Sequence, residues 1–278
     1  AGGIFGPAIK RSGFDAIFFK GQSEKPIYLL ITQEGISLED AKFLWGKDTV
    51  ETEDALMEKH GQRACVASIG PAGENLSLIS GISNDKGRIA ARSGLGAVMG
   101  SKKLKAICVM ANKKLEYADR SKLRELNKYD FARMKYFKSS PLIKAIGTKL
   151  DYIAPLMRVS KMGLSAPGSI IPRLMGTMYG NVALGTNMST IISSQNGDSP
   201  VKNYKGVGYV DYPMKKAMKL RAKRLNEYGK KQYGCFSCPL KCGYLLEYDK
   251  LPYKVKETHR PDYETVCSFG AMILNDDM

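Results

Sequence analysis

Three cysteines, Cys235, Cys238 and Cys242, constrain this chain more than any other feature, because they form a C-x2-C-x3-C run in YGCFSCPLKCGYLLEY. Thiolates separated by two and three residues can lie on one turn and face a single metal ion. A zinc ion needs a fourth Cys or His, and His259 is the only downstream histidine. The same spacing suits a [4Fe–4S] cluster whose last cysteine is distant in the chain. The run predicts a metal site, with zinc and iron–sulfur both open and free structural cysteines as the weaker alternative.

The remaining cysteines, Cys65, Cys108 and Cys267, stand singly, so the six cysteines do not suggest a disulfide scaffold. This usage fits a reducing cytoplasm. No run of about eighteen apolar residues is present, so no transmembrane helix is expected. The chain begins without Met and ends inside an apolar pattern, and we interpret it as an internal piece of a longer protein.

The chain carries 43 Lys and Arg against 27 Asp and Glu, a formal net charge of +16. One interpretation is a solvated lysine-rich surface. The other is a field that attracts anionic partners such as phosphates, CoA thioesters or an acidic electron carrier. No helix-turn-helix or RNP-like segment accompanies the charge, so nucleic acid is not an expected partner.

Residues 1–115 are predicted to form an α+β domain. Apolar runs bounded by Gly, Pro or charged turns predict strands within 14–21, 25–32, 63–70 and 104–111. Residues 37–61 have helical spacing, with Ser37 and Thr49 as expected caps before acidic first turns.

Residues 116–278 change character, and we place the domain boundary near 112–120. Residues 115–160 are charged and helix-forming, as the stretch 120–147 illustrates, whereas 160–212 are rich in Gly, Ser, Pro and Met and are predicted to be irregular. Residues 212–229 are predicted to be helical again and lead directly into the cysteine run.

Two glycine-containing stretches could bind an anion. Residues 87–109, GRIAARSGLGAVMGSKKLKAICV, surround Arg92 with glycines but match neither the P-loop nor the G-x-G-x-x-G pattern, so a tight loop is favoured over a phosphate cradle. Residues 67–85 contain Gly70-Pro71 and predict a turn at a helix N-terminus. A structural turn is again favoured over a ligand site.

The segment ETHRPDYETVC, 257–267, brings His259, Asp262, Glu264 and Cys267 close together. A histidine and carboxylates can donate and accept protons when burial tunes them. A solvated acidic turn would have a similar sequence, so the segment alone is weak evidence.

Together these stretches resemble the tungsten-containing aldehyde ferredoxin oxidoreductase family. The similar blocks, in the family's order, are GGIFGPAIKRSGFDAIFFKGQSEKPIYL, ASIGPAGENL, RSGLGAVMGSKKLKAI, CFSCPLKCG and PDYET. The resemblance covers nearly all of this chain, which is less than half of a typical member. It implies a β-rich pterin-binding domain at 1–115, then the first part of a mainly helical domain with a cluster motif at 116–278.

The resemblance also implies cofactors. Two molybdopterins would hold tungsten or molybdenum, and Mg2+ would bridge their phosphates. The matching positions are Gly2, Gly3, Arg92, Ser93, Gly94 and Gly96. Cys235, Cys238 and Cys242 match three ligands of a [4Fe–4S] cluster, and the family's fourth cysteine lies beyond Met278.

Within PDYET, where the family has PEYET, Asp262 or Glu264 matches a catalytic carboxylate, and Asp at 262 leaves open which of them acts. His259 is a candidate proton donor. Cys267, directly after YETV, resembles a feature of the tungsten subunit of class II benzoyl-CoA reductases, in which a cysteine thiolate binds the metal. A buried apolar cysteine is the equal alternative.

The implied activity is oxidation of aldehydes to carboxylates, with electrons passed to ferredoxin or another low-potential carrier. Reduction of an aromatic CoA thioester is the alternative within the family. An iron–sulfur electron carrier and a zinc-stabilised binding protein are alternatives outside it. A homo-oligomer or a larger electron-transfer complex is also open.

Overall fold

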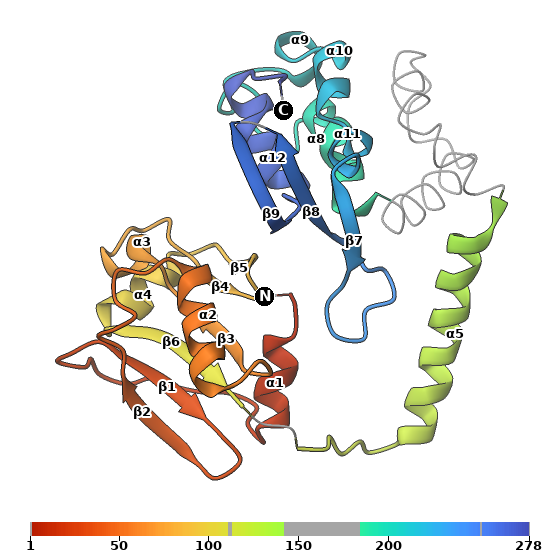
Figure 1. The fold of residues 1–278 in the computed structure, drawn as a ribbon. Helices are drawn as coiled ribbons and strands as arrows, with labels where there is room; N and C mark the ends of the chain where they lie inside the picture. The colour runs from red at the N-terminus through yellow and green to blue at the C-terminus, as the bar shows by residue number, and fades with distance from the viewer. Residues whose placement is uncertain (1, 111–112, 142–183, 251, 278) are drawn as a thin grey trace. The chain divides into compact units, whose positions relative to one another are not determined.

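The computed structural model describes residues 2–110, 113–141, 184–250 and 252–277. The chain divides into two compact units, unit 1 (Ala1–Ala118) and unit 2 (Asp119–Met278), whose elements are labelled in Figure 1. Among the helices described, none is both long enough and apolar enough to cross a membrane.

Unit 1 is built on a mixed six-stranded sheet with the order β2-β1-β6-β3-β4-β5. Its strands are β1 (Ile27–Ile31), β2 (Ile36–Asp40), β3 (Cys65–Ser68), β4 (Ile82–Asn84), β5 (Arg88–Ala90) and β6 (Leu104–Val109). β1 and β6 are parallel, and every other neighbouring pair is antiparallel. The strands predicted within 25–32, 63–70 and 104–111 are confirmed. The short strands β4 and β5 were not predicted.

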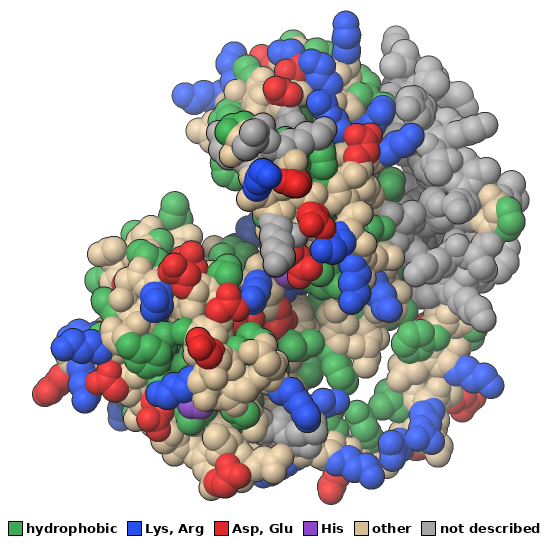
Figure 2. Space-filling view, viewed as in Figure 1, with side chains coloured by type: hydrophobic (Ala, Val, Ile, Leu, Met, Phe, Trp, Pro, Cys, Tyr) green, Lys and Arg blue, Asp and Glu red, His purple; other side chains and the backbone are tan. Residues whose placement is uncertain are grey.

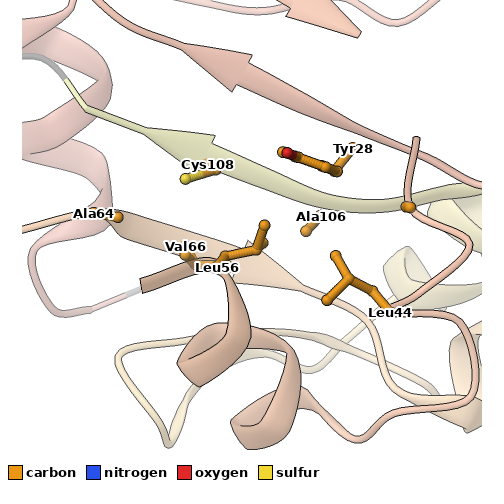
Figure 3. Close-up of a cluster of buried hydrophobic side chains, with 8 residues drawn as sticks. Tyr28, Leu44, Leu56, Ala64, Val66, Ala106 and Cys108 are labelled. Carbon is orange, nitrogen blue, oxygen red and sulfur yellow. The ribbon is translucent and has the colours of Figure 1, made fainter. Parts of the chain in front are cut away.

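Helices cover both faces of this sheet, and this burial explains why the sequence of β1 is apolar without interruption. Tyr28 of β1 points into a cluster with Leu56 of α2 (Thr49–His60), whereas Leu29 packs on the other face with α1 (Phe5–Arg11). The α2-side cluster consists of Tyr28, Ala41, Leu44, Leu56, Ala64, Val66, Ala106 and Cys108 (Figure 3).

Two predictions for unit 1 are wrong. Residues 14–21 form no strand, and Phe18 within them is 92% exposed, so the apolar run lacks a pairing partner. The helix predicted over 37–61 begins only at Thr49, because Ser37 lies in β2 and pairs with β1.

Asp48, rather than Thr49, caps α2. Its carboxylate accepts the N–H groups of Val50 and Glu51, both at 2.8 Å. The Glu51 side chain in turn accepts the Asp48 N–H at 3.0 Å, which completes a capping box. This reciprocal pair fixes where the helix starts.

Unit 2 combines one helix of 20 residues, α5, and several short helices with a second sheet. Its helices are α5 (Arg120–Ser139), η2 (Gly185–Met188), α8 (Ser189–Asn196), α9 (Gly208–Asp211), α10 (Met214–Ala217), η3 (Met218–Leu220), α11 (Ala222–Asn226), α12 (Tyr263–Phe269) and η4 (Ala271–Ile273). Its strands, β7 (Gly229–Tyr233), β8 (Gly243–Lys250) and β9 (Tyr253–His259), pair antiparallel in that order.

The predictions for unit 2 have mixed outcomes. The helix within 120–147 is confirmed to Ser139, and residues 142–147 lie outside the described part. The irregular segment 160–212 lies partly outside it too. Among its described residues, η2, α8 and α9 are helical and contradict the prediction, whereas residues 197–207 are irregular as predicted. The 212–229 helix is broken into short pieces, and the β7–β8–β9 sheet was not predicted. The α+β class is confirmed.

Candidate functional site

The glycine-rich stretch 87–109 folds as β5, α4 (Leu95–Ser101) and β6, not as the tight loop that its composition favoured. Its glycines serve helix packing. A Cβ on Gly100 would overlap the carbonyl oxygen of Gly73, in the short helix α3 (Pro71–Glu74). Because only glycine permits the two helices to come this close, the glycines of this stretch fix α4 against α3. The turn predicted at Gly70 is confirmed as the start of α3.

Arg92 and Ser93 lie directly before α4 and are both exposed. Gly94 follows in the left-handed conformation, with φ 64°, and Gly96 is buried inside the helix. An exposed guanidinium suits phosphate binding, because its planar donors match phosphate oxygens. The donor chemistry at this end of α4 therefore fits an anionic cofactor.

Gly2 and Gly3 lie against the turn of the β4–β5 hairpin. The Asn84 amide donates to the Gly2 carbonyl at 3.0 Å, and the Asp85 carboxylate accepts the Ile4 N–H at 2.6 Å. The first turn of α4 packs near the opposite end of β4, where the Gly96 N–H donates to the carbonyl of Ser80, two residues before β4 begins. The two predicted pterin segments thus contact opposite ends of one hairpin.

A buried ion pair joins two of the family-like blocks in unit 1. The side chains of Lys105 and Glu74 form a salt bridge and are 0% and 5% exposed. Lys105 also donates to the Lys47 carbonyl at 2.8 Å, and Glu74 accepts the Gly46 N–H. Burial lowers the pKa of Lys105, and the Glu74 contact opposes that effect. Sequence reasoning missed the pair, although a lysine inside the apolar run LKAICV was a usable signal.

The three cysteines of the C-x2-C-x3-C run all lie in the 234–242 loop that joins β7 to β8 (Figure 1). Each is half-buried and in no disulfide, and the Cys238 N–H donates to the Cys235 carbonyl at 3.0 Å. Within the described ranges, no three His, Cys, Asp or Glu side chains gather as a metal site requires. Thiolate sites need not be preformed, because metal binding can order them. Three thiols on one loop fit an iron–sulfur or zinc site.

Arg260 holds the end of this loop. It is 5% exposed, its Nη2 donates to the Cys242 carbonyl at 3.1 Å and its Nη1 donates to Asn226. The guanidinium also lies over the Tyr244 ring, 4.4 Å from the centroid. A Cβ on Gly185 would overlap both Arg260 Nη2 and the Cys242 carbonyl oxygen. Burial lowers the pKa of Arg260, whose guanidinium nonetheless stays protonated.

The two residues after Gly185 hold the PDYET segment. Thr186 Oγ1 donates to the Asp262 carboxylate at 2.9 Å, and the Asn187 amide donates to the Pro261 carbonyl at 2.7 Å. We call Gly185–Asn187 the bracket, because it contacts both the cysteine loop and the start of α12. No sequence pattern had marked it within the stretch predicted to be irregular.

The other predicted residues of this region lie in different surroundings. Asp262 is half-buried at the start of α12, and Glu264 is exposed. His259 Nδ1 shares a hydrogen bond of 2.5 Å with the hydroxyl of Tyr233, the last residue of β7. Cys267 is 1% exposed, lies 3.8 Å from the Thr190 carbonyl, and burial raises the pKa of its thiol.

Two family models match this chain. "Aldehyde ferredoxin oxidoreductase, N-terminal domain" matches residues 1–111, and "Aldehyde ferredoxin oxidoreductase, domains 2 & 3" matches residues 171–278. The chain belongs to the aldehyde ferredoxin oxidoreductase family. The family assignment therefore covers both the glycine-lined segments of unit 1 and the cysteine loop of unit 2.

Named relatives agree with this assignment. The tungsten-containing aldehyde ferredoxin oxidoreductases of Pyrococcus furiosus and Thermococcus kodakarensis are 34% and 33% identical over 99% of this chain. The chain spans only 38% of the length of each. The solved active-site complex BamBC of benzoyl coenzyme A reductase aligns with 100% of this chain and 39% of its own, at TM-score 0.62 and 20% identity. At that identity the likeness shows the fold alone.

Proposed function

We propose that this chain is part of a tungsten–pterin oxidoreductase that oxidises aldehydes to carboxylates. Electrons would leave through a [4Fe–4S] cluster to ferredoxin or another low-potential carrier. The observation that carries the proposal is the family membership of both halves, together with relatives at 33–34% identity that are named tungsten-containing aldehyde ferredoxin oxidoreductases. Because the chain spans 38% of those relatives, the activity belongs to the whole protein.

The cofactor-binding roles follow from donor chemistry. Cys235, Cys238 and Cys242 would ligate three irons of the cluster, since thiolates are the usual ligands of [4Fe–4S] centres. The positions assigned to the pterin phosphates and their bridging Mg2+ are Gly2, Gly3, Arg92, Ser93, Gly94 and Gly96. When bound, tungsten or molybdenum supplies two-electron redox chemistry that protein side chains lack.

Three side chains are candidates for proton transfer at the substrate. Asp262 has its carboxylate fixed by Thr186, whereas Glu264 is exposed. His259 is paired with Tyr233, and this contact can orient its ring. We propose that one of the carboxylates manages the proton that aldehyde oxidation releases. Comparison of Asp262→Asn with Glu264→Gln identifies it, because only loss of the acting carboxylate lowers kcat strongly, by about a hundredfold or more.

The surface charge suits an acidic carrier. Lys and Arg side chains are distributed over the faces of both units that Figure 2 shows and do not form one patch. We propose cytoplasmic location for the whole protein, in line with six cysteines that are all free. Ferredoxin reduction would then weaken as ionic strength rises.

The deciding experiment is elemental analysis and assay of the full-length protein purified without oxygen. The proposal expects tungsten or molybdenum, about four irons per chain from one cubane, and aldehyde-dependent reduction of a viologen dye. Cys238→Ser should lose iron, whereas the matched control Cys65→Ser, outside the loop, should keep it. Iron without pterin would instead indicate an electron carrier, and zinc with DNA binding a zinc-stabilised binding protein.

The same preparation tests the alternative substrate. Activity on benzoyl-CoA with none on aldehydes would replace aldehyde oxidation with the benzoyl-CoA subtype. Cys267 as a tungsten ligand belongs to that subtype and stays a prediction. Its burial against the Thr190 carbonyl also fits an inert core thiol.

A further inference from the structure

Arg260 is a buried cation whose partners are almost all neutral. Its guanidinium donates to the side-chain amide oxygen of Asn226 and to the backbone carbonyl of Cys242, and its flat face lies over Tyr244. In the described part of the chain, no carboxylate lies within ion-pair distance of it. Its buried Nε also has no hydrogen-bond partner among those residues. The negative charge of Asp262 acts on the guanidinium only from beyond ion-pair distance. A buried charge whose direct partners are dipoles is costly, so this arrangement requires an explanation.

The place of this charge is specific. Arg260 Nη2 is 3.1 Å from the carbonyl oxygen of Cys242, one of the three loop cysteines. Asn226, the last residue of α11, accepts from Nη1, and the missing side chain of Gly185 leaves room for Nη2 beside Cys242. Three separate segments therefore cooperate to keep one positive charge next to one cysteine.

We propose that Arg260 is a positioning residue that fixes Cys242 and raises the reduction potential of the iron–sulfur cluster bound by the cysteine loop. This inference rests on the proposed function, because it requires the cluster. Reduction adds an electron to the cluster, and a fixed nearby cation stabilises the more negative form. Burial strengthens the effect, since charge interactions are weakly screened away from water.

Three variants of the full-length protein separate charge from packing. Arg260→Gln removes the charge but leaves a polar side chain. Arg260→Lys keeps the charge but loses the planar fork that reaches both Asn226 and Cys242. Asn226→Ala removes only the Nη1 acceptor. Lys223→Gln on α11 is the matched control, because Lys223 is exposed and its charge is screened by solvent.

The measurement is an anaerobic redox titration followed by the EPR signal of the reduced cluster, with iron content determined for each variant. Arg260→Gln should shift the reduced-to-oxidised ratio at a given potential at least tenfold toward the oxidised form. For a one-electron couple this equals a potential about 59 mV lower. Arg260→Lys and Asn226→Ala should give smaller shifts in the same direction, and Lys223→Gln should give none.

Each outcome decides the proposal. If iron-loaded Arg260→Gln keeps the wild-type potential and EPR line shape, Arg260 has only a structural role and the inference fails. If Arg260→Gln does not fold or does not bind iron, an unmoved potential in Asn226→Ala overturns the inference, and a lowered one supports it. Absence of iron from the wild-type protein would remove the proposed function itself, which separates that failure from this one.

Discussion

The two units hold their family-like blocks in opposite ways. In unit 1 the blocks contact one another, since Glu74 pairs with Lys105 and Gly73 packs against Gly100. In unit 2 the cysteine loop and the PDYET segment are instead held by the bracket and by Arg260. Thr186 of the bracket donates a hydrogen bond to Asp262, which follows it by 76 positions in the sequence.

The difference indicates which role the motif residues have in each unit. The blocks of unit 1 include buried residues that stabilise their own packing, so replacement of one of these buried residues should destabilise the unit. The motif residues of unit 2 are half-buried or exposed apart from Gly243 and Cys267, and their support comes from residues outside the motif. Their replacement should alter chemistry more than stability.

The largest expected effect is on the ion pair of unit 1. Lys105→Met leaves Glu74 as a buried, unpaired carboxylate, which should lower the free energy of unfolding by about 3–5 kcal/mol. Hydrogen exchange under increasing urea, followed in peptides that cover residues 65–109 of the full-length protein, measures the loss. The matched control is Lys254→Met, whose partner Asp249 is 73% exposed, and it should change stability by less than about 0.5 kcal/mol.

The same pair predicts a pH dependence. The folded pKa of Lys105 lies below the ordinary lysine value of 10.5, so between these two pH values the unfolded chain binds more protons than the folded chain. The free energy of unfolding should therefore rise with pH in that window, and the slope should vanish in Lys105→Met. If Lys105 instead made the free energy of unfolding fall as pH rises, burial could not be the dominant influence on its pKa.

Disruption of the close contact between α3 and α4 in unit 1 should cause the next largest loss of stability. Gly100→Ala places a methyl group against the Gly73 carbonyl, and overpacking of this kind costs about 3 kcal/mol. Gly35→Ala is the control, because its added methyl meets open space. Equal exchange rates in the two variants would show that α3 and α4 can separate without cost.

The contrast also explains what the sequence could predict. Central strands were found because β1 is a continuous apolar run and β6 is apolar apart from Lys105, and the cysteine loop was found because its spacing is local. Arg260 and the bracket were missed because their roles depend on side-chain contacts with segments far away in sequence. The 14–21 strand failed because an apolar run forms a strand only when a neighbouring strand pairs with it.

A smaller effect is expected where the bracket meets α12. Thr186→Val keeps the shape of the side chain but removes the hydrogen bond to Asp262, at a cost of about 1 kcal/mol. If Asp262 acts in catalysis, aldehyde turnover should fall by more than the stability change explains. Ser268→Ala, which removes a bond within α12, is the control and should leave turnover unchanged. Equal turnover in both variants would place the working carboxylate elsewhere.

The reactivity of Cys267 distinguishes a metal ligand from a thiol that only packs in the core, and its measurement needs no substitution. Burial raises the pKa of Cys108 in unit 1 to about 12, and it also raises that of Cys267. Because the thiolate is the reactive form, Cys108 should react with iodoacetamide at pH 8 roughly a thousandfold more slowly than an unperturbed thiol. A core thiol at Cys267 should stay unlabelled before and after anaerobic removal of metals, whereas Cys235 and Cys238 should become labelled after it. Labelling of Cys267 only after metal removal would favour a role as a metal ligand. Cys267 would then differ from Cys108, which packs in the core of unit 1.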